Sequence, residues 1–236
     1  MKSAICFVAF NNDLFVNALL TSLVVHSNFY DVYIFNNGTD DIDIMPLPQE
    51  KLNITILDNR NNNYINFDEF FKLNNPKYPD YWNNNYASLH HTLALDYMIK
   101  NLQYDKLIVC DVDVIFKQNL ESLLSLDYDV IGEIGNNPTM GNIVESRLKP
   151  FFFIIKKESM IDCPFFDKQR FLLLSSDKYD TGSSFLEDIL ALHKRFLTIN
   201  IDDYISHFGG GTWFFKGKNN YTPWLNKNSE HLTWRK

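Results

Sequence analysis

The sequence predicts an α/β fold with a mostly parallel central sheet flanked by helices and a smaller mixed part toward the C-terminus. Over the first 130 residues, strand-like and helix-like segments alternate, which is the pattern of a parallel sheet covered by helices. The segments 4–10 and 107–110 are uninterrupted apolar runs, as expected for strands that are buried on both faces. The length of 236 residues is enough for one sizeable domain. We therefore expect a single domain over 1–236, with halves at 1–116 and 117–236.

The individual elements follow from local patterns. Apolar segments in the first half predict strands at 4–10, 32–35, 54–57 and 106–111. Helical spacing of apolar residues predicts helices at 14–25 and 88–102. The segment 59–85 is rich in Asn, Tyr and Pro, and it predicts a long irregular loop over the sheet. In the second half we expect a helix at 183–196 and strands at 129–134, 151–155 and 197–201.

The composition excludes several classes of protein. The net charge is −7, and no run of Lys and Arg marks a face that binds nucleic acid. The acidic balance also argues against tight docking on anionic lipid. Cys6, Cys110 and Cys163 lie far apart without a CxxC motif, which favours a reducing compartment and no metal–thiolate site. No apolar run is long enough for a membrane span, so we expect a cytoplasmic protein that meets the inner face of a membrane only peripherally, through its substrate.

A pair of carboxylates closes the fourth predicted strand. Because side chains alternate along a strand, Asp111 and Asp113 are expected to project to the same side at its carboxyl end. Open α/β sheets bind ligands at that end of their strands. Two carboxylates at such a short separation repel each other unless a cation lies between them. The pair therefore predicts a divalent metal with oxygen ligands, which can neutralise a diphosphate leaving group.

The segment LIVCDVDVIF at 107–116 resembles the DxD segment of GT-A glycosyltransferases. The preceding chain resembles the nucleotide-binding half of glycosyltransferase family 2, in order, over residues 3–116. The matching features are a polar turn after the first strand, a D/N-N/D-G-S/T-x-D segment after the second, an acidic end of the third, and small or polar residues on the helix before the DxD. They are carried here by Phe10-Asn11-Asn12, Asn36-Asn37-Gly38-Thr39-Asp40-Asp41, Asp58, and Ser88, His90 and His91.

This resemblance implies a GT-A fold, which is the nucleotide-diphospho-sugar transferase fold. It also implies a metal-dependent glycosyltransferase of bacterial polysaccharide biosynthesis. Such an enzyme moves a sugar from a nucleotide-sugar donor, which we expect to be UDP-linked, to a glycan, glycolipid or glycosylated acceptor. The residues expected to line the donor pocket are Phe10, Asn11, Asn37, Asp58, Ser88, His91, Asp111, Val112 and Asp113.

A second informative segment is Ser206-His207-Phe208-Gly209-Gly210-Gly211. His207 resembles the late histidine that many metal-dependent GT-A enzymes add to the DxD metal. Imidazole beside carboxylates favours Mn²⁺ over Mg²⁺, although both ions suit the site. Gly209 and Gly210 are expected to let backbone N–H groups approach the phosphates of the donor.

A carboxylate base is expected near the start of the helix at 183–196, where it takes the proton of the attacking acceptor hydroxyl. Asp180 is the first candidate and Asp188 the second, and both imply inversion at the anomeric carbon. The alternatives are a retaining, family 8-like enzyme, since a late His-x-x-Gly also occurs there, and a nucleotide-sugar-binding protein without catalysis. Arg147, beside the strand at 151–155, is interpreted as a charge at the strand edge.

Overall fold

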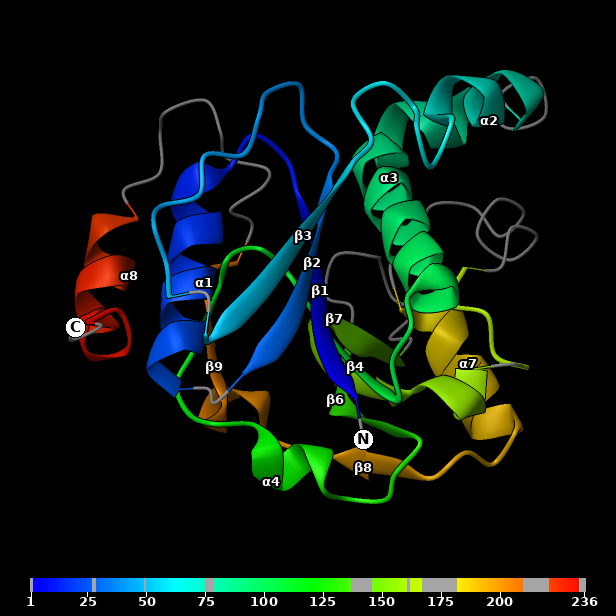
Figure 1. The fold of residues 1–236 in the computed structure, drawn as a ribbon. Coiled ribbons are helices and arrows are strands. Elements are labelled where there is room, and N and C mark those ends of the chain that lie inside the picture. Colours follow the sequence, from blue (N-terminus) through cyan, green and yellow to red (C-terminus); the bar gives the residue numbers. More distant parts are fainter. Residues whose placement is uncertain are drawn as a thin grey trace.

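A seven-stranded sheet crosses the centre of the computed structural model, in the order β3-β2-β1-β4-β7-β6-β8 (Figure 1). The structure describes residues 2–26, 29–48, 50–74, 79–136, 146–160, 162–166, 182–209 and 221–233. The strands are β1 (Ser3–Ala9), β2 (Tyr30–Asn36), β3 (Leu52–Asp58), β4 (Lys106–Cys110), β6 (Val130–Asn136), β7 (Ser146–Lys156) and β8 (Phe196–Thr198). A second, two-stranded sheet pairs β5 (Val114–Phe116) with β9 (Ile205–His207).

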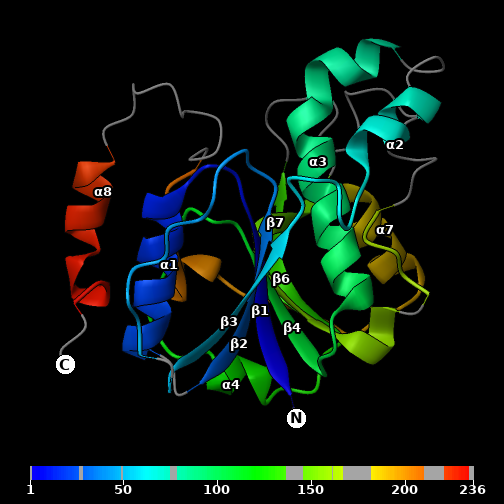
Figure 2. The same cartoon turned by 45° about the horizontal axis from the view of Figure 1, so that its top comes forward.

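Helices cover both faces of the large sheet. They are α1 (Asp13–His26), α2 (Phe67–Asn74), α3 (Pro79–Asn101), α4 (Glu121–Leu124), α7 (Ser183–Ala191) and α8 (Thr222–Lys227). Short 3-10 turns occupy Lys157–Met160, Ile201–Asp203 and Ser229–His231. Figures 1 and 2 show α1 on one face of the sheet and α3 and α7 on the other, with α8 outside α1. Among the described helices, none has the length and apolarity needed to cross a membrane.

The first four strands of the chain run parallel, which brings their carboxyl ends to one edge of the sheet. The register pairs Ala9 with Asn36 and Asn36 with Asp58, so the polar residues after these strands start from the same level. The other strands make the sheet mixed, because β7 runs antiparallel to β4 and β6. This arrangement confirms the predicted mostly parallel α/β fold with a mixed distal part.

Alternation along the buried strands divides the core into two layers. On β1, Ile5, Phe7 and Ala9 pack in the cluster that includes α1, whereas Ala4, Cys6 and Val8 pack in the cluster that includes α3 and α7. The side chains on both sides of β1 are 0–6% exposed. Burial on both faces explains why the strand is an unbroken apolar run in the sequence.

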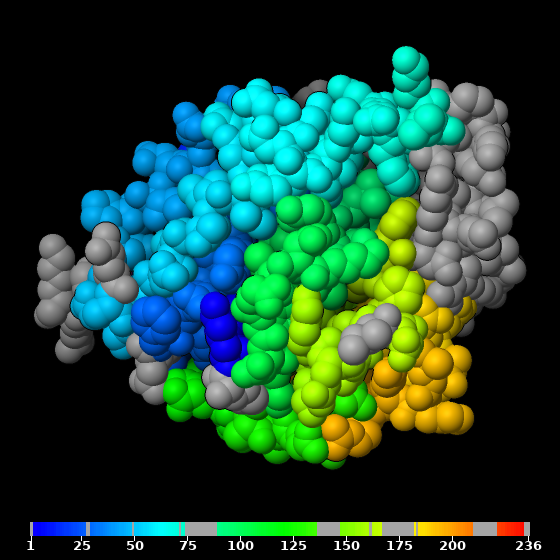
Figure 3. All heavy atoms as spheres, turned by 45° about the vertical axis from the view of Figure 1, so that its right-hand side comes forward, coloured from blue at the N-terminus to red at the C-terminus, as the bar shows by residue number. Residues whose placement is uncertain are grey.

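The predicted loop at 59–85 is wrong in part, because it contains α2 and the first turns of α3. Asn66 begins α2 as a capping residue, since its Oδ1 accepts a hydrogen bond from the Glu69 N–H at 2.9 Å. Phe67 is buried against Leu89 and Leu93 of α3. The space-filling view shows the chain before residue 75, in cyan, lying against the green part of the molecule that contains the rest of α3 (Figure 3).

Two boundaries in the second half also differ from the prediction. The helix predicted at 183–196 ends at Ala191, because His193 has the left-handed value of φ, 51°, which a helix cannot continue. Phe196 then pairs with Val130 as part of β8, and Ile201 begins a 3-10 turn rather than ending a strand. The strands β5 and β9 and the helices α4 and α8 were not predicted.

Helix α8 and the turn after it hold the C-terminal part of the chain against α1. Trp224 packs on Phe15, with ring centroids 5.8 Å apart. At the other end of α1, His26 Nε2 lies 3.0 Å from His231 Nδ1. Residues 221–233, which we call the C-terminal segment, are thus fastened to both ends of α1.

Gly182 and Gly209 provide a matched test of backbone strain. Both have a positive φ, 88° and 81°, but a Cβ at Gly182 would lie 2.5 Å from the Leu148 carbonyl oxygen, whereas one at Gly209 would meet nothing within 4 Å. We expect Gly209→Ala to cost about 1–2 kcal/mol of unfolding free energy, from the left-handed backbone alone. Gly182→Ala should cost distinctly more, as measured by urea denaturation. Equal losses would contradict the close contact with Leu148.

The histidine pair on α1 predicts a loss of stability in acid. Burial, and then the charge of His231, lower the pKa of His26, while Glu230 partly opposes them. The unfolded chain therefore binds more protons at this position as pH falls through about 6.5, so the free energy of unfolding decreases. His26→Gln should flatten the dependence of unfolding free energy on pH between about 7.5 and 5.5. His193→Gln, a change at an exposed turn, is the control and should leave the slope as in the wild type.

Candidate functional site

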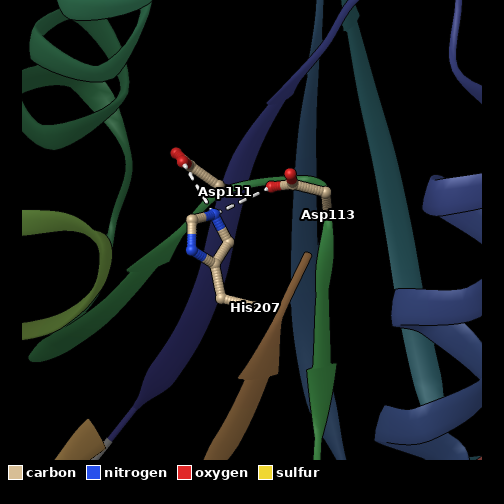
Figure 4. Close-up of side chains that lie close together, drawn as sticks. All are labelled: Asp111, Asp113 and His207. Carbon is tan, nitrogen blue, oxygen red and sulfur yellow. Dashed lines mark ion pairs between the residues drawn. The ribbon is translucent and has the colours of Figure 1, made fainter. Parts of the chain in front are cut away.

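Three metal-ligating side chains meet beyond the carboxyl end of β4. Asp111 directly follows β4, Asp113 directly precedes β5, and His207 is the last residue of β9. His207 Nε2 lies 3.2 Å from Asp113 Oδ1 and 3.8 Å from Asp111 Oδ2. Figure 4 shows the imidazole with this nitrogen turned toward the two carboxylates. One ligand atom from each residue falls within 4.8 Å of the others, so the three side chains can share one ion.

Backbone pairing holds these three residues in place. In the ladder of β5 and β9, Val114 pairs with His207, and the Phe208 N–H donates to the Asp113 carbonyl at 3.0 Å. The Asp111 N–H donates to the Phe151 carbonyl of β7 at 3.2 Å. Each ligand is therefore fixed by a strand, although a turn at Val112 and Asp113 separates β4 from β5.

Aromatic side chains hold His207 and the residues on either side of it. Its ring stacks on that of Phe151, with centroids 4.0 Å apart and planes 12° apart. Trp224 of the C-terminal segment donates a hydrogen bond from Nε1 to Ser206 Oγ at 3.0 Å, and its ring lies 5.4 Å from that of Phe208. The residues on both sides of His207 are thereby tied to α8. Sequence reasoning identified Phe151 only as a strand residue and did not identify Trp224.

Burial and neighbouring charges shift the pKa values of Asp111 and His207. Desolvation raises the pKa of Asp111, and Asp113 raises it further, against the lowering effect of His91, His207 and Arg147. Burial lowers the pKa of His207, but the nearby carboxylate of Asp113 outweighs it, so the net pKa is raised. The site therefore retains protons that a cation would displace.

The donor set fits a divalent cation. His207 Nε2 is buried and has no hydrogen-bond partner within the described part of the chain. A buried polar atom without a partner is costly, and a bound ion is one of the arrangements that removes the cost. Two carboxylates and one imidazole suit Mn²⁺, and the oxygen ligands also suit Mg²⁺.

Other predicted residues line the same edge of the sheet, but some of them are already engaged. Asn11 adopts a positive φ of 50°, and its Oδ1 accepts hydrogen bonds from the N–H groups of Thr39, at 2.7 Å, and Asp40, at 3.2 Å. It joins the loops after β1 and β2. Gly38 is required there, because a Cβ would lie 2.1 Å from Asn11 Oδ1. Phe10 is 45% exposed beside this junction.

Asp58 forms an ion pair with Arg60, which the sequence did not lead us to predict. Arg60 donates to both of its carboxylate oxygens, at 2.8 and 2.6 Å, and also pairs with Asp41 at 2.6 Å. The hydrogen bond from Arg60 lowers the pKa of Asp58. The charge of Asp58 is therefore neutralised by Arg60 at the rim of the site. The two-residue spacing of Asp58 and Arg60 in the sequence could have indicated this ion pair.

Two adjacent histidines of α3 face different parts of the site. His90 stacks on Phe67, with ring centroids 3.9 Å apart, and lies 3.5 Å from Asn37 Nδ2. Burial lowers its pKa to about 4, with Asp68 opposing the shift, so the ring is neutral near pH 7. His91 instead places Nε2 3.4 Å from Asp111 Oδ1. His91 thus lies at the carboxylates, whereas His90 lies with Asn37.

The remaining predicted residues are less informative. Val112 is 1% exposed in the core, so only its backbone is available to a donor. Ser88 belongs to α3, and Asp188 belongs to α7 outside the three-ligand cluster. Gly209 directly follows Phe208 and has open space around it. Asp180 and Gly210 lie outside the described residues.

The fold is that of GT-A-type glycosyltransferases, as comparison with solved structures indicates. The galactosyltransferase LgtC, solved with donor and acceptor sugar analogs, matches with a TM-score of 0.53 and 13% identity, over 84% of this chain and 73% of that one. Mouse xyloside xylosyltransferase 1 matches with a TM-score of 0.52 and 11% identity, over 85% of this chain and 86% of that one. At these identities, the likeness concerns the fold alone.

The glycosyltransferase GlyE of Streptococcus pneumoniae TIGR4 matches with a TM-score of 0.50 and 12% identity, over 94% of this chain and 53% of that one. This chain therefore spans about half the length of GlyE. No family model and no curated protein sequence matches the chain.

Competition between protons and metal at His207 is directly testable. Because the net pKa of His207 is raised, imidazole protonation persists above the ordinary pKa of about 6.5, and Mn²⁺ must displace that proton. We expect Mn²⁺ affinity to increase as pH rises through this range, with proton release on binding. Calorimetric titrations in two buffers of different ionisation enthalpy measure the release. Mn²⁺ binding that is as tight at pH 5.5 as at pH 8 would show that His207 is not a ligand.

Proposed function

We propose that this chain transfers a sugar from a nucleotide-diphosphate donor, UDP-linked, to a glycan, glycolipid or glycosylated acceptor. In this proposal Asp111, Asp113 and His207 hold Mn²⁺ or Mg²⁺. The observation that carries it is the meeting of these three side chains at the carboxyl edge of a GT-A-type sheet. The glycosyltransferases that share the fold support sugar transfer as the reaction class.

The residues around the cluster suggest how the donor is held. The bound cation would neutralise the diphosphate as the bond to the sugar breaks. Gly209, two residues after His207, has open space where a side chain would stand, which leaves room for phosphate oxygens near the backbone. Asn37 directly follows β2, neutral His90 lies in the middle of α3, and the two offer polar contacts without charge to the nucleoside. We assign the diphosphate to the cluster side and the nucleoside to the Asn37 side.

We propose inversion, with Asp180 as the base and Asp188 as the second candidate. Gly182, at the start of α7, approaches the Leu148 carbonyl of β7. Because β7 is antiparallel to β4 and Cys110 pairs with Phe152, Leu148 lies beyond the carboxyl end of β4, on the side of the metal cluster. Asp180 precedes Gly182 by two residues, whereas Asp188 lies about 9 Å down the helix axis, at a rise of about 1.5 Å per residue. Measuring the anomeric configuration of the product by NMR separates inversion from the retaining alternative.

We also propose a bacterial, cytoplasmic setting in polysaccharide synthesis, at the inner face of a membrane through the acceptor. The three cysteines are all buried free thiols, which fits a reducing compartment. The resemblance to family 2 enzymes supports the polysaccharide setting.

Asp113 is the residue whose change tests the proposed function most directly. Its side chain is 4% exposed and lies closest to His207. We expect Asp113→Asn to lower transfer by about 10²–10³-fold or more, comparable to the loss of a major electrostatic contact in a transition state, and to weaken Mn²⁺-dependent donor binding. Asp162→Asn, a change at an exposed position, is the matched control and should retain wild-type activity.

The assay starts from a thermal-shift screen of nucleotide sugars with and without Mn²⁺, because a ligand stabilises the folded state that binds it. Nucleotide release from the stabilising donor then reports turnover. Full turnover by Asp113→Asn would overturn the metal site. Donor binding without nucleotide release, with every acceptor tried, would favour a binding protein that has no catalytic activity.

A further inference from the structure

Asp111 lies between two histidines from different parts of the fold. Its Oδ2 faces His207 Nε2 of β9 at 3.8 Å, and its Oδ1 faces His91 Nε2 of α3 at 3.4 Å. The two carboxylate oxygens thus have separate surroundings. One points into the metal cluster and the other toward α3.

His91 is outside the group of side chains that can share one ion. That group contains Asp111, Asp113 and His207, with ligand atoms within 4.8 Å of one another. The contact of His91 is with Asp111, through the oxygen that has no hydrogen-bond partner in the described structure. His91 is therefore placed to act on a ligand of the metal rather than on the metal.

Asp111 is also the carboxylate that needs such support. Its side chain is 26% exposed, whereas that of Asp113 is 4% exposed. Helix α3 packs on the sheet that contains β4, through Ala94, Leu95 and Met98. The backbone that carries His91 is therefore held in place by buried contacts. A hydrogen bond from the His91 imidazole to Oδ1 would limit rotation of the Asp111 carboxylate.

We propose that His91 is a positioning residue, which donates from Nε2–H to Asp111 Oδ1 and leaves Oδ2 to the metal. The proposal rests on the metal site of the proposed function and extends it. The separation of 3.4 Å is longer than an ordinary N–H···O hydrogen bond of about 2.9 Å. A bound cation would fix Asp111 and would shorten this contact, as polar contacts in ligand-free sites commonly shorten when the site is filled. Partners of metal ligands act in this way, by setting the orientation of the ligand.

The competing interpretation has His91 touching the donor directly, as the sequence resemblance implied. The two differ in what happens without a nucleotide. A positioning residue changes the affinity for the metal alone, whereas a donor contact changes only the affinity for the nucleotide sugar. Mn²⁺ binding in the absence of nucleotide therefore separates them.

The experiment compares His91→Leu with His91→Gln in the full chain. Leu keeps much of the volume but has no donor, while Gln carries an N–H donor at about the reach of Nε2. We expect His91→Leu to weaken Mn²⁺ binding about 10–100-fold, the usual effect of losing a partner of a metal ligand, and His91→Gln to restore most of it. Titration of free Mn²⁺ by electron paramagnetic resonance gives the affinity, and the spectrum of bound Mn²⁺ reports its ligand field. His193→Gln is the control, since it makes the same change at an exposed turn.

Each outcome bears on the proposal. Wild-type Mn²⁺ affinity in both His91 variants overturns it, and if transfer is then lost, His91 contacts the donor. Should His91→Leu fail to fold, His91→Asn replaces it, because Asn is too short to reach Asp111 Oδ1 and should bind Mn²⁺ more weakly than His91→Gln. Equal affinities of the Asn and Gln variants would likewise overturn the positioning role. A wild-type protein that binds no Mn²⁺ overturns the metal site itself, which is a different failure from a change confined to His91.

Discussion

The pairing of β5 with β9 is the interaction on which the candidate site depends. It joins Val114 to His207, and it is the contact that carries a residue from late in the sequence to the two carboxylates beyond β4. Only three residue pairs form this ladder, so it contributes few hydrogen bonds of its own. Its position is secured from outside, by the stack of Phe151 on His207 and by the hydrogen bond from Trp224 to Ser206. Aromatic pairs of this kind contribute roughly 0.5–1.5 kcal/mol beyond the area they bury.

The parallel half of the sheet has a different part in the site. It places the residues that follow β1, β2, β3 and β4 at one edge. Some of these residues hold the loops together, as Asn11 and Arg60 do, and others remain directed at the site, as Asp111 does. Some polar residues at strand ends therefore stabilise the loops around the site, and others are available to a ligand. The side-chain contacts in the structure distinguish the two groups.

The parallel half was predictable because strands buried on both faces leave unbroken apolar runs, as at 4–10, and the carboxylates follow such a run directly. Strands of three residues, such as β5 and β9, are too short to show alternation, so the nearness of His207 to Asp113 was expected only from the family resemblance. Helix α2 did leave a signal, since Asn66 and Glu69 have the spacing of a capping pair, but the Asn-rich surroundings hid it. The stack of Phe151 on His207 joins distant elements and leaves no local pattern.

The fastening of the C-terminal segment to α1 and β9 has a consequence for synthesis of the chain. Chains fold as they emerge from the ribosome, N-terminal parts first, so β1 to β4 and their helices can pack while later residues are still being added. The contacts of Trp224 with Ser206 and Phe15 form only after residues 221–233 have been translated. The nascent protein therefore carries its two aspartates in place well before the histidine is secured beside them. The capacity to hold a cation is thus acquired later than the parallel half of the sheet.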